Sequence, residues 1–151
     1  MKIENVIKST TALSLNKKTL LNIIYTQNLL AENFSEILKK YDLSQEQYHV
    51  LDVLKSKNGE PANMFEIQEQ MISKASNTTR LVDKLLLKGY IKREVCSKNR
   101  RKIDVFITES GLTVLTDVKP MINIFEEKLS QNLSFKELED LNFLLEKYRS
   151  V

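Results

Sequence analysis

The side chains best suited to recognise a partner gather in residues 73–90. The polar members of this stretch are Ser76, Asn77, Thr79, Arg80 and Lys84. Hydroxyl, amide and guanidinium groups pair with base edges in the DNA major groove. A helix that exposes them near its N-terminus could therefore read DNA. An ordinary surface helix would show the same pattern, so this stretch alone leaves both interpretations open.

The apolar residues of the same stretch predict that it is a helix. They recur at three- and four-residue steps, which places them on one helical face. They are Thr78, Leu81, Val82, Leu85 and Leu86. We expect Ser73 to cap the N-terminus of this helix and Gly89 to end it.

Two β-rich segments follow the helix, at residues 90–95 and 103–108. Val105 and Ile107 occupy alternate positions of the second segment, which favours a strand. The loop between the segments is cationic, with Lys98, Arg100, Arg101 and Lys102. A helix, a strand, a basic loop and a strand in this order predict a winged helix-turn-helix.

Positive charge is concentrated in the same part of the chain. Residues 73–102 hold ten Lys or Arg against Asp83 and Glu94, a local net charge of +8; since the whole chain carries +3, the remainder carries −5. A surface that neutralises phosphates would segregate charge in this way. We therefore expect the partner to be double-stranded DNA.

Length and composition predict a single mainly α (α+β) protein. The chain has 151 residues, of which 42% are hydrophobic and 28% charged, and its three Gly and two Pro imply few loops. No apolar run approaches the roughly 20 residues of a membrane span, and the N-terminus lacks a signal-peptide core. We expect a cytoplasmic protein with no membrane partner. Its one cysteine, Cys96, excludes an intramolecular disulfide.

Further helices are expected on both sides of the winged segment. The apolar pattern of residues 17–40 predicts a helix about 36 Å long, more than one small domain can cover. Ser44 and Gln47 have capping-box spacing for the next helix, and Asn63 is expected to cap a short helix over residues 64–71. This short helix and the one after it make a helix-turn-helix.

After the wing, Thr108 is expected to cap a long helix that Pro120 kinks, and Ser134 opens a terminal helix with Glu137 in a second capping box. We therefore expect a winged helix-turn-helix DNA-binding domain at residues 41–108. Residues 1–40 and 109–151 would form a helical dimerisation region. A homodimer would present two recognition helices to a pseudo-palindromic operator.

The sequence offers no catalytic constellation. A single histidine, His49, excludes an HExxH zinc site, and three isolated glycines exclude a phosphate-binding loop. We expect no enzyme activity, no metal and no cofactor.

Three stretches in this order resemble the multiple-antibiotic-resistance regulator (MarR) family: LSQEQYHVL, TTRLVDKLLLKGYIKR and NRRKIDVFITESG. The resemblance covers residues 17–150. It implies a homodimeric transcriptional regulator, commonly a repressor that is released by small aromatic or phenolic ligands or by oxidation of a cysteine. One position departs from the family, whose wing usually reads Asp-x-Arg. Here Asn99 replaces the aspartate and cannot ion-pair with Arg101, so we expect a less rigid wing.

The resemblance also implies an effector crevice lined by the first, second and fifth helices. The candidate polar groups there are Tyr25, Asn28 and His49. Alternatively, Tyr25 packs in the core, and His49 is a packed or half-exposed residue. Two further hypotheses stay open. Cys96, close to several cations, could serve a redox-responsive regulator or be a small hydrophobe. The winged helix could also be a dimeric protein-interaction module that binds no DNA.

Overall fold

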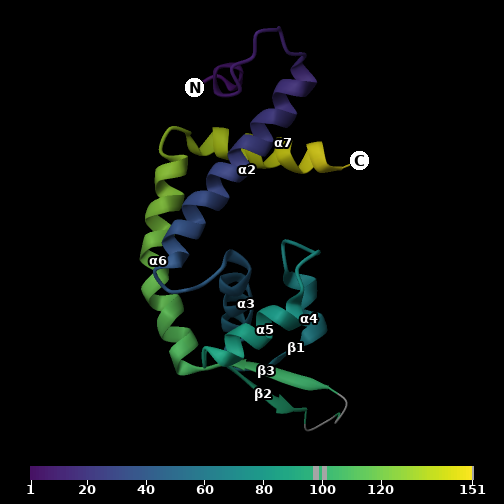
Figure 1. Ribbon diagram of the computed structural model, residues 1–151, viewed down its shortest axis with the longest axis vertical. Coiled ribbons are helices and arrows are strands. Elements are labelled where there is room, and N and C mark those ends of the chain that lie inside the picture. The colour runs from purple at the N-terminus through teal and green to yellow at the C-terminus, as the bar shows by residue number, and fades with distance from the viewer. Residues whose placement is uncertain (97–98, 100–101, 151) are drawn as a thin grey trace.

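The protein is built mainly of helices, with a small winged unit at one end (Figure 1). The computed structural model describes residues 1–96, 99 and 102–150. The helices are α1 (Ile3–Val6), α2 (Leu15–Lys39), α3 (Gln45–Ser56), α4 (Met64–Gln70), α5 (Thr78–Leu87), α6 (Glu109–Ser130) and α7 (Phe135–Arg149). The strands are β1 (Ala62–Asn63), β2 (Ile91–Val95) and β3 (Ile103–Ile107). The predicted fold class, a mainly α winged helix-turn-helix, is confirmed.

The three strands form one antiparallel sheet in the order β1-β3-β2. β2 and β3 make the predicted hairpin, which starts with Ile91 opposite Ile107. The sequence did not predict β1, which is only two residues long and pairs Ala62 with Val105 of β3. This third strand fixes the start of α4 to the wing.

The core of the winged unit lies where α3, α5, the sheet and the first half of α6 meet. Each of these elements contributes fully buried side chains at helical or strand spacing. They include Leu51, Leu54, Val82, Leu85, Val105, Leu115, Val118 and Ile122. The apolar face expected for α5 is therefore present, except that Leu86 is 39% exposed and lies at its edge.

Local capping interactions set the start of most helices. In six of them the residue before the helix accepts a backbone N–H bond on its side chain: Ser14, Ser44, Asn63, Asn77, Thr108 and Ser134. The caps at Ser44, Asn63, Thr108 and Ser134 were predicted, and the capping boxes at Ser44 and Ser134 are confirmed. Because Ser14 caps α2, this helix begins at Leu15 rather than at residue 17.

The long helices α2 and α6 pack together, and α7 crosses α2 at the end far from the wing (Figure 1). Phe34 of α2 meets Phe125 of α6 edge to face, with ring centroids 6.4 Å apart. Helix α6 continues through Pro120. Leu112 and Leu129 of α6 are 39% and 41% exposed. Leu112 lies at the edge of the buried stripe, and Leu129 lies near the C-terminal end of the helix, beyond the core.

A large apolar surface surrounds α7. None of its fifteen residues is buried, and Leu141, Phe143 and Leu144 are 44%, 61% and 58% exposed. Exposed apolar surface of this extent usually marks an interaction site. Within the described part of the chain, every helix is too short or too polar to cross a membrane.

Candidate nucleic-acid interface

The recognition helix α5 starts later than the sequence suggested. The side-chain oxygen of Asn77 accepts a hydrogen bond from the backbone N–H of Arg80 at 3.0 Å, so Asn77 is the N-cap. The predicted cap, Ser73, is wrong and lies in the turn before the helix. Thr78 accounts for this start, because its buried hydroxyl donates a hydrogen bond to Gln68 of α4.

The exposed face of α5 carries the side chains expected to read DNA. Thr79, Arg80 and Lys84 are exposed and Ser76 is half-buried. A groove of about 380 Å³ between the start of α3 and α5 is lined by Ser44, Glu46, Ser76, Asn77, Arg80, Leu81 and Lys84. The structure therefore brings Ser76, Asn77, Arg80 and Lys84 together along one groove, whereas Thr79 lies outside its lining.

The capping bond limits what Asn77 can offer to DNA. An asparagine that reads adenine uses both its amide oxygen and its amide nitrogen. Because the oxygen of Asn77 already accepts the Arg80 N–H, only the nitrogen remains to donate. The guanidinium of Arg80 forms no ion pair with a described residue, so its donors are not held by a carboxylate there.

Helix α5 ends in the predicted glycine turn. Gly89 has φ of +72°, a left-handed conformation that glycine adopts without steric cost. The N–H of Gly89 donates to the carbonyl of Leu86 at 3.0 Å, and the N–H of Tyr90 donates to that of Leu85 at 3.1 Å. These two bonds form a Schellman motif, which leads the chain from α5 directly into β2.

Two ion pairs hold α5 against its neighbours. Asp83 of α5 meets Arg93 of β2 with an N–O distance of 2.6 Å, and Lys88 meets Asp42 in the α2–α3 loop at 2.7 Å. The hydrogen bond from Lys88 is the main reason that the pKa of Asp42 lies below its ordinary value. The Nε of Arg93 is buried and has no partner among the described residues. Sequence analysis missed both pairs because it saw these cations only as part of a basic patch.

Backbone hydrogen bonds close the base of the wing. The N–H of Cys96 donates to the carbonyl of Lys102 at 3.0 Å, and the N–H of Lys102 donates to the carbonyl of Asn99 at 2.8 Å. Cys96 is half-buried at the end of β2, and Lys102 is exposed. Three predicted DNA contacts lie outside the described residues: Lys98, Arg100 and Arg101.

The three predicted effector residues lie on two helices, α2 and α3. Tyr25 and Asn28 are exposed on α2, and His49 is half-buried on α3. A cavity of about 480 Å³ does lie between α2 and α7, lined by Asn22, Ile23, Thr26, Gln27, Leu30, Ala31, Gln45, Leu141 and Leu145. None of the three candidates is in that lining.

The winged part of the chain matches a known family. The model of the MarR family matches residues 43–103. The transcriptional repressor MprA of Escherichia coli (strain K12) is 27% identical over 127 residues, which cover 84% of this chain and 72% of MprA.

Solved structures extend the likeness over nearly the whole chain. A MarR-like transcription regulator from Bacillus cereus ATCC 10987 superposes with a TM-score of 0.77 at 26% identity, covering 89% of this chain and 95% of that one. The fold is also that of MepR from S. aureus in its DNA complex, with a TM-score of 0.79 at 21% identity, covering 91% and 98% of the two chains. MprA and the B. cereus protein are regulators, not enzymes, as the sequence predicted for this chain. The family model, the relative and the shared fold agree, and this chain resembles the MarR family of winged helix-turn-helix transcriptional regulators.

Proposed function

We propose that this protein is a homodimeric repressor that binds a pseudo-palindromic operator through the exposed face of α5. The observation that carries the proposal is the groove in which Arg80 and Lys84, one helical turn apart, follow the capped start of α5. The opposite face of the same helix is buried at Val82 and Leu85, so the polar face can only point outward. Two relatives support this proposal, since MprA is a repressor and MepR was solved bound to DNA.

The side chains of α5 would make two kinds of contact with DNA, to base edges and to phosphates. Arg80, which can pair with guanine through two hydrogen bonds, and Thr79 would contact base edges. Lys84, farther along the helix, would contact phosphate, a contact that carries affinity without sequence preference. Ser76 and the amide nitrogen of Asn77 would contribute hydrogen bonds near the start of the helix.

The wing would approach the flanking minor groove. Arg101 is the residue we expect to enter it, because narrow A·T-rich minor grooves concentrate negative potential. Lys98, Arg100 and Lys102 would touch phosphates. The proposal for the wing rests on sequence position, apart from Lys102, which is exposed beside the backbone bonds that close the loop.

A second copy of this chain would cover the apolar surface around α7. Leu141, Phe143 and Leu144 are exposed on α7, and Leu20 and Ile24 are 49% and 47% exposed on the nearby half of α2. Two-fold symmetry would then place the two α5 helices about one DNA turn, roughly 34 Å, apart. In this arrangement residues 1–40 and 109–151 dimerise, and residues 41–108 bind DNA.

A small aromatic or phenolic ligand would release the repressor. The cavity between α2 and α7 suits its apolar part, since Ile23, Leu30, Leu141 and Leu145 line it. The polar candidates Tyr25 and Asn28 lie on α2, which borders the cavity, and His49 lies on α3, whose first residue, Gln45, also lines it. Oxidation of Cys96 is the alternative trigger, with the thiol half-buried at the base of the wing.

The experiment that tests the proposal selects duplexes from a random pool with the purified protein. We expect enrichment of an inverted repeat, bound at least about a thousandfold more tightly than random DNA, with affinity that falls as salt rises. Lys55→Ala, which removes an exposed cation at the far end of α3, serves as the control and should bind normally. If no duplex binds in a salt-dependent way, the winged helix is a protein-interaction module instead.

A further inference from the structure

The turn after α3 holds the one Asn-Gly pair of the chain, Asn58-Gly59. Both residues are exposed, and both have positive φ, +53° at Asn58 and +94° at Gly59. The N–H of Glu60 donates to the carbonyl of Lys57 at 3.1 Å, which closes the turn around them. Two successive residues with positive φ inside such a bond make a type I′ turn, for which Asn-Gly is a preferred sequence.

An asparagine that precedes a glycine can close a ring with the backbone. The backbone nitrogen of Gly59 attacks the side-chain amide carbon of Asn58, and no Cβ on the glycine hinders the approach. The N–H proton passes through solvent to the departing amide nitrogen, which leaves as ammonia, and a succinimide ring remains. Water then opens the ring at either carbonyl and gives aspartate or isoaspartate. In isoaspartate the main chain runs through the side-chain carbons, so the backbone gains one methylene group.

The structure leaves both reacting groups accessible. The side-chain amide of Asn58 and the N–H of Gly59 make no hydrogen bond with a described residue. Apart from its chain neighbours, no atom lies within 4 Å of the Cβ position of Gly59, so the space around the pair is open. The backbone rotation that brings the two groups together therefore opens one exposed hydrogen bond, from Glu60 to Lys57, and displaces no packed side chain.

Four other asparagines are held where the ring does not close. Asn33 and Asn142 lie inside α2 and α7, and their side-chain amides donate to backbone carbonyls one turn earlier. Inside a helix, moreover, the next backbone nitrogen is bonded to a carbonyl and is not available to attack. Asn63 and Asn77 use their side-chain oxygens to cap α4 and α5, which fixes the orientation of both amides.

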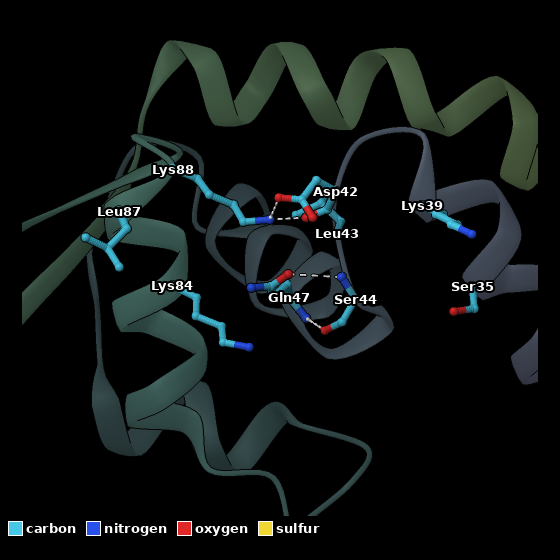
Figure 2. A pocket seen from close by; sticks show the side chains of 9 residues that line it. All are labelled: Ser35, Lys39, Asp42, Leu43, Ser44, Gln47, Lys84, Leu87 and Lys88. Carbon is cyan, nitrogen blue, oxygen red and sulfur yellow. Dashed lines mark hydrogen bonds and ion pairs between the residues drawn. The ribbon is translucent and has the colours of Figure 1, made fainter.

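Asp42 provides a comparison within the same chain, since its φ of +51° is also left-handed. An aspartate can close the same ring with loss of water. Figure 2 shows the carboxylate of Asp42 bonded by Lys88, and the N–H of the next residue, Leu43, donates to the carbonyl of Leu38 at 3.2 Å. Both reacting groups are engaged at Asp42, in contrast to those of Asn58.

We propose that Asn58 is a site of spontaneous deamidation, and that the isoaspartate formed there loosens the attachment of α4 to the wing. The segment after the turn is fixed, because Ala62 pairs with Val105 of β3 and Asn63 caps α4. A turn that is one methylene longer shifts this segment relative to α3. The pairing of β1 with β3 or the start of α4 is then disturbed.

The new charge acts in the same direction as the longer backbone. Lys57, next to the modified residue, bonds the carboxylate of Glu66 in α4 at 3.2 Å. A carboxylate at position 58 competes for this ammonium group and weakens its bond to α4. Because both groups of this pair are partly exposed, the change of backbone has the larger effect.

Helix α4 supports the recognition helix through the hydrogen bond from Thr78 to Gln68. Weaker DNA binding by the isoaspartyl protein follows from the displacement of α4. This consequence rests on the proposed function, whereas the modification and its effect on stability do not.

The test incubates the folded full chain at mildly alkaline pH, where ring closure is faster, and maps its peptides by mass spectrometry. A methyltransferase that labels isoaspartyl carboxylates identifies the product. We expect residue 58 to convert faster than every other asparagine of the chain, with isoaspartate as the larger share. The same chain unfolded in guanidinium chloride is the reference for an unconstrained Asn58. An Asn58 that stays intact in the folded chain, whatever its rate in the unfolded one, would overturn the proposal.

Gly59→Ala tests the route, because its Cβ hinders the attack and conversion should slow. Conversion of Gly59→Ala at the unchanged rate would indicate direct hydrolysis of the amide, which overturns the isoaspartate.

Asn58→Asp is the matched control for the structural effect, since it adds the charge without lengthening the backbone, and aspartate also tolerates positive φ. The isoaspartyl protein, separated by ion exchange, should melt at a lower temperature than both Asn58→Asp and the unchanged protein. A melting temperature equal to that of Asn58→Asp would overturn the loosening of α4. If the isoaspartyl protein melts lower and still binds the operator with unchanged affinity, the consequence for DNA binding is wrong and the modification stands.

Discussion

The contact between α6 and the end of the recognition helix leads to a prediction for Gly111. This glycine lies in the first turn of α6, buried against the turn that follows α5. A Cβ at this position would lie 2.3 Å from the carbonyl oxygen of Tyr90 and 2.8 Å from a side-chain carbon of Ile107. The Tyr90 carbonyl cannot move freely, since it accepts the N–H of Thr108 at 3.0 Å. We therefore expect Gly111→Ala to displace the start of α6 or the turn after α5.

Two effects of opposite sign set the size of the loss. Alanine is about 1 kcal/mol more favourable than glycine inside a helix, which favours the variant. Overpacking a buried position costs typically about 1 to 3 kcal/mol and more where backbone must shift, and here the nearest atom belongs to the backbone. We expect the second effect to win, with a net loss of about 2 kcal/mol. For a chain of this size the melting temperature would then fall by about 4 to 8 °C.

Thermal unfolding followed by circular dichroism at one fixed protein concentration measures this loss, since association would otherwise shift the transition. Gly59→Ala is the matched control, because Gly59 has open space around its Cβ position but a φ of +94°. It should lose about 1 kcal/mol through backbone strain alone. A melting temperature of Gly111→Ala equal to or above that of the unchanged protein would refute the steric argument.

Four further variants test other parts of the structure. Arg80→Ala should weaken operator binding by about 1 to 3 kcal/mol and have little effect on binding to random DNA. Lys84→Ala should weaken binding to operator and random DNA equally; anisotropy titrations measure both variants. If Arg80→Ala lost the same affinity for operator and for random DNA, Arg80 would not read bases. Phe143→Asp, which puts a charge on the apolar surface of α7, should shift the protein to the 17.6 kDa monomer in light scattering, and an unchanged mass would exclude α7 from the interface. The pKa of Glu66 lies below its ordinary value of 4.5, chiefly because the backbone N–H of Asn63 donates to its carboxylate. The stability that this bond adds is complete above pH 4.5 and is lost as the pH falls through the lowered pKa. The melting temperature of Glu66→Gln should therefore lie closer to that of the unchanged protein at pH 3 than at pH 7. A difference in melting temperature that stays constant with pH would contradict this.

Capping was the most predictable feature of the fold because it is local. At Ser44 and Ser134 a side-chain oxygen accepts the N–H three residues later, and both partners can be read within one turn of sequence. The start of α5 could not be read in this way, since Ser73 and Asn77 are both good N-caps. The hydrogen bond between Thr78 and Gln68, ten residues apart in the chain, favours the second. Tertiary contact therefore decided between two equal local signals.

Pairing across distance accounts for what the sequence did not show. Strand β1 has only two residues and exists because Ala62 lies opposite Val105 of β3, so neither segment predicts it alone.

Ion pairs within the basic segment, residues 73–102, bear on the salt dependence that we expect for DNA binding. The structure describes seven of the ten cations in residues 73–102 and pairs Lys88, Lys92 and Arg93 of these with carboxylates, which leaves four described cations without an ion pair. Each phosphate contact adds about −0.9 to the slope of log affinity against log salt. If these four and the three cations outside the described residues all bind phosphate, the slope is about −6 per protomer, or roughly −13 for a dimer. Binding measured between low and high salt on one operator gives this slope directly. A steeper value would show that an ion pair such as Asp83 with Arg93 opens on DNA, or that cations outside this segment join the interface.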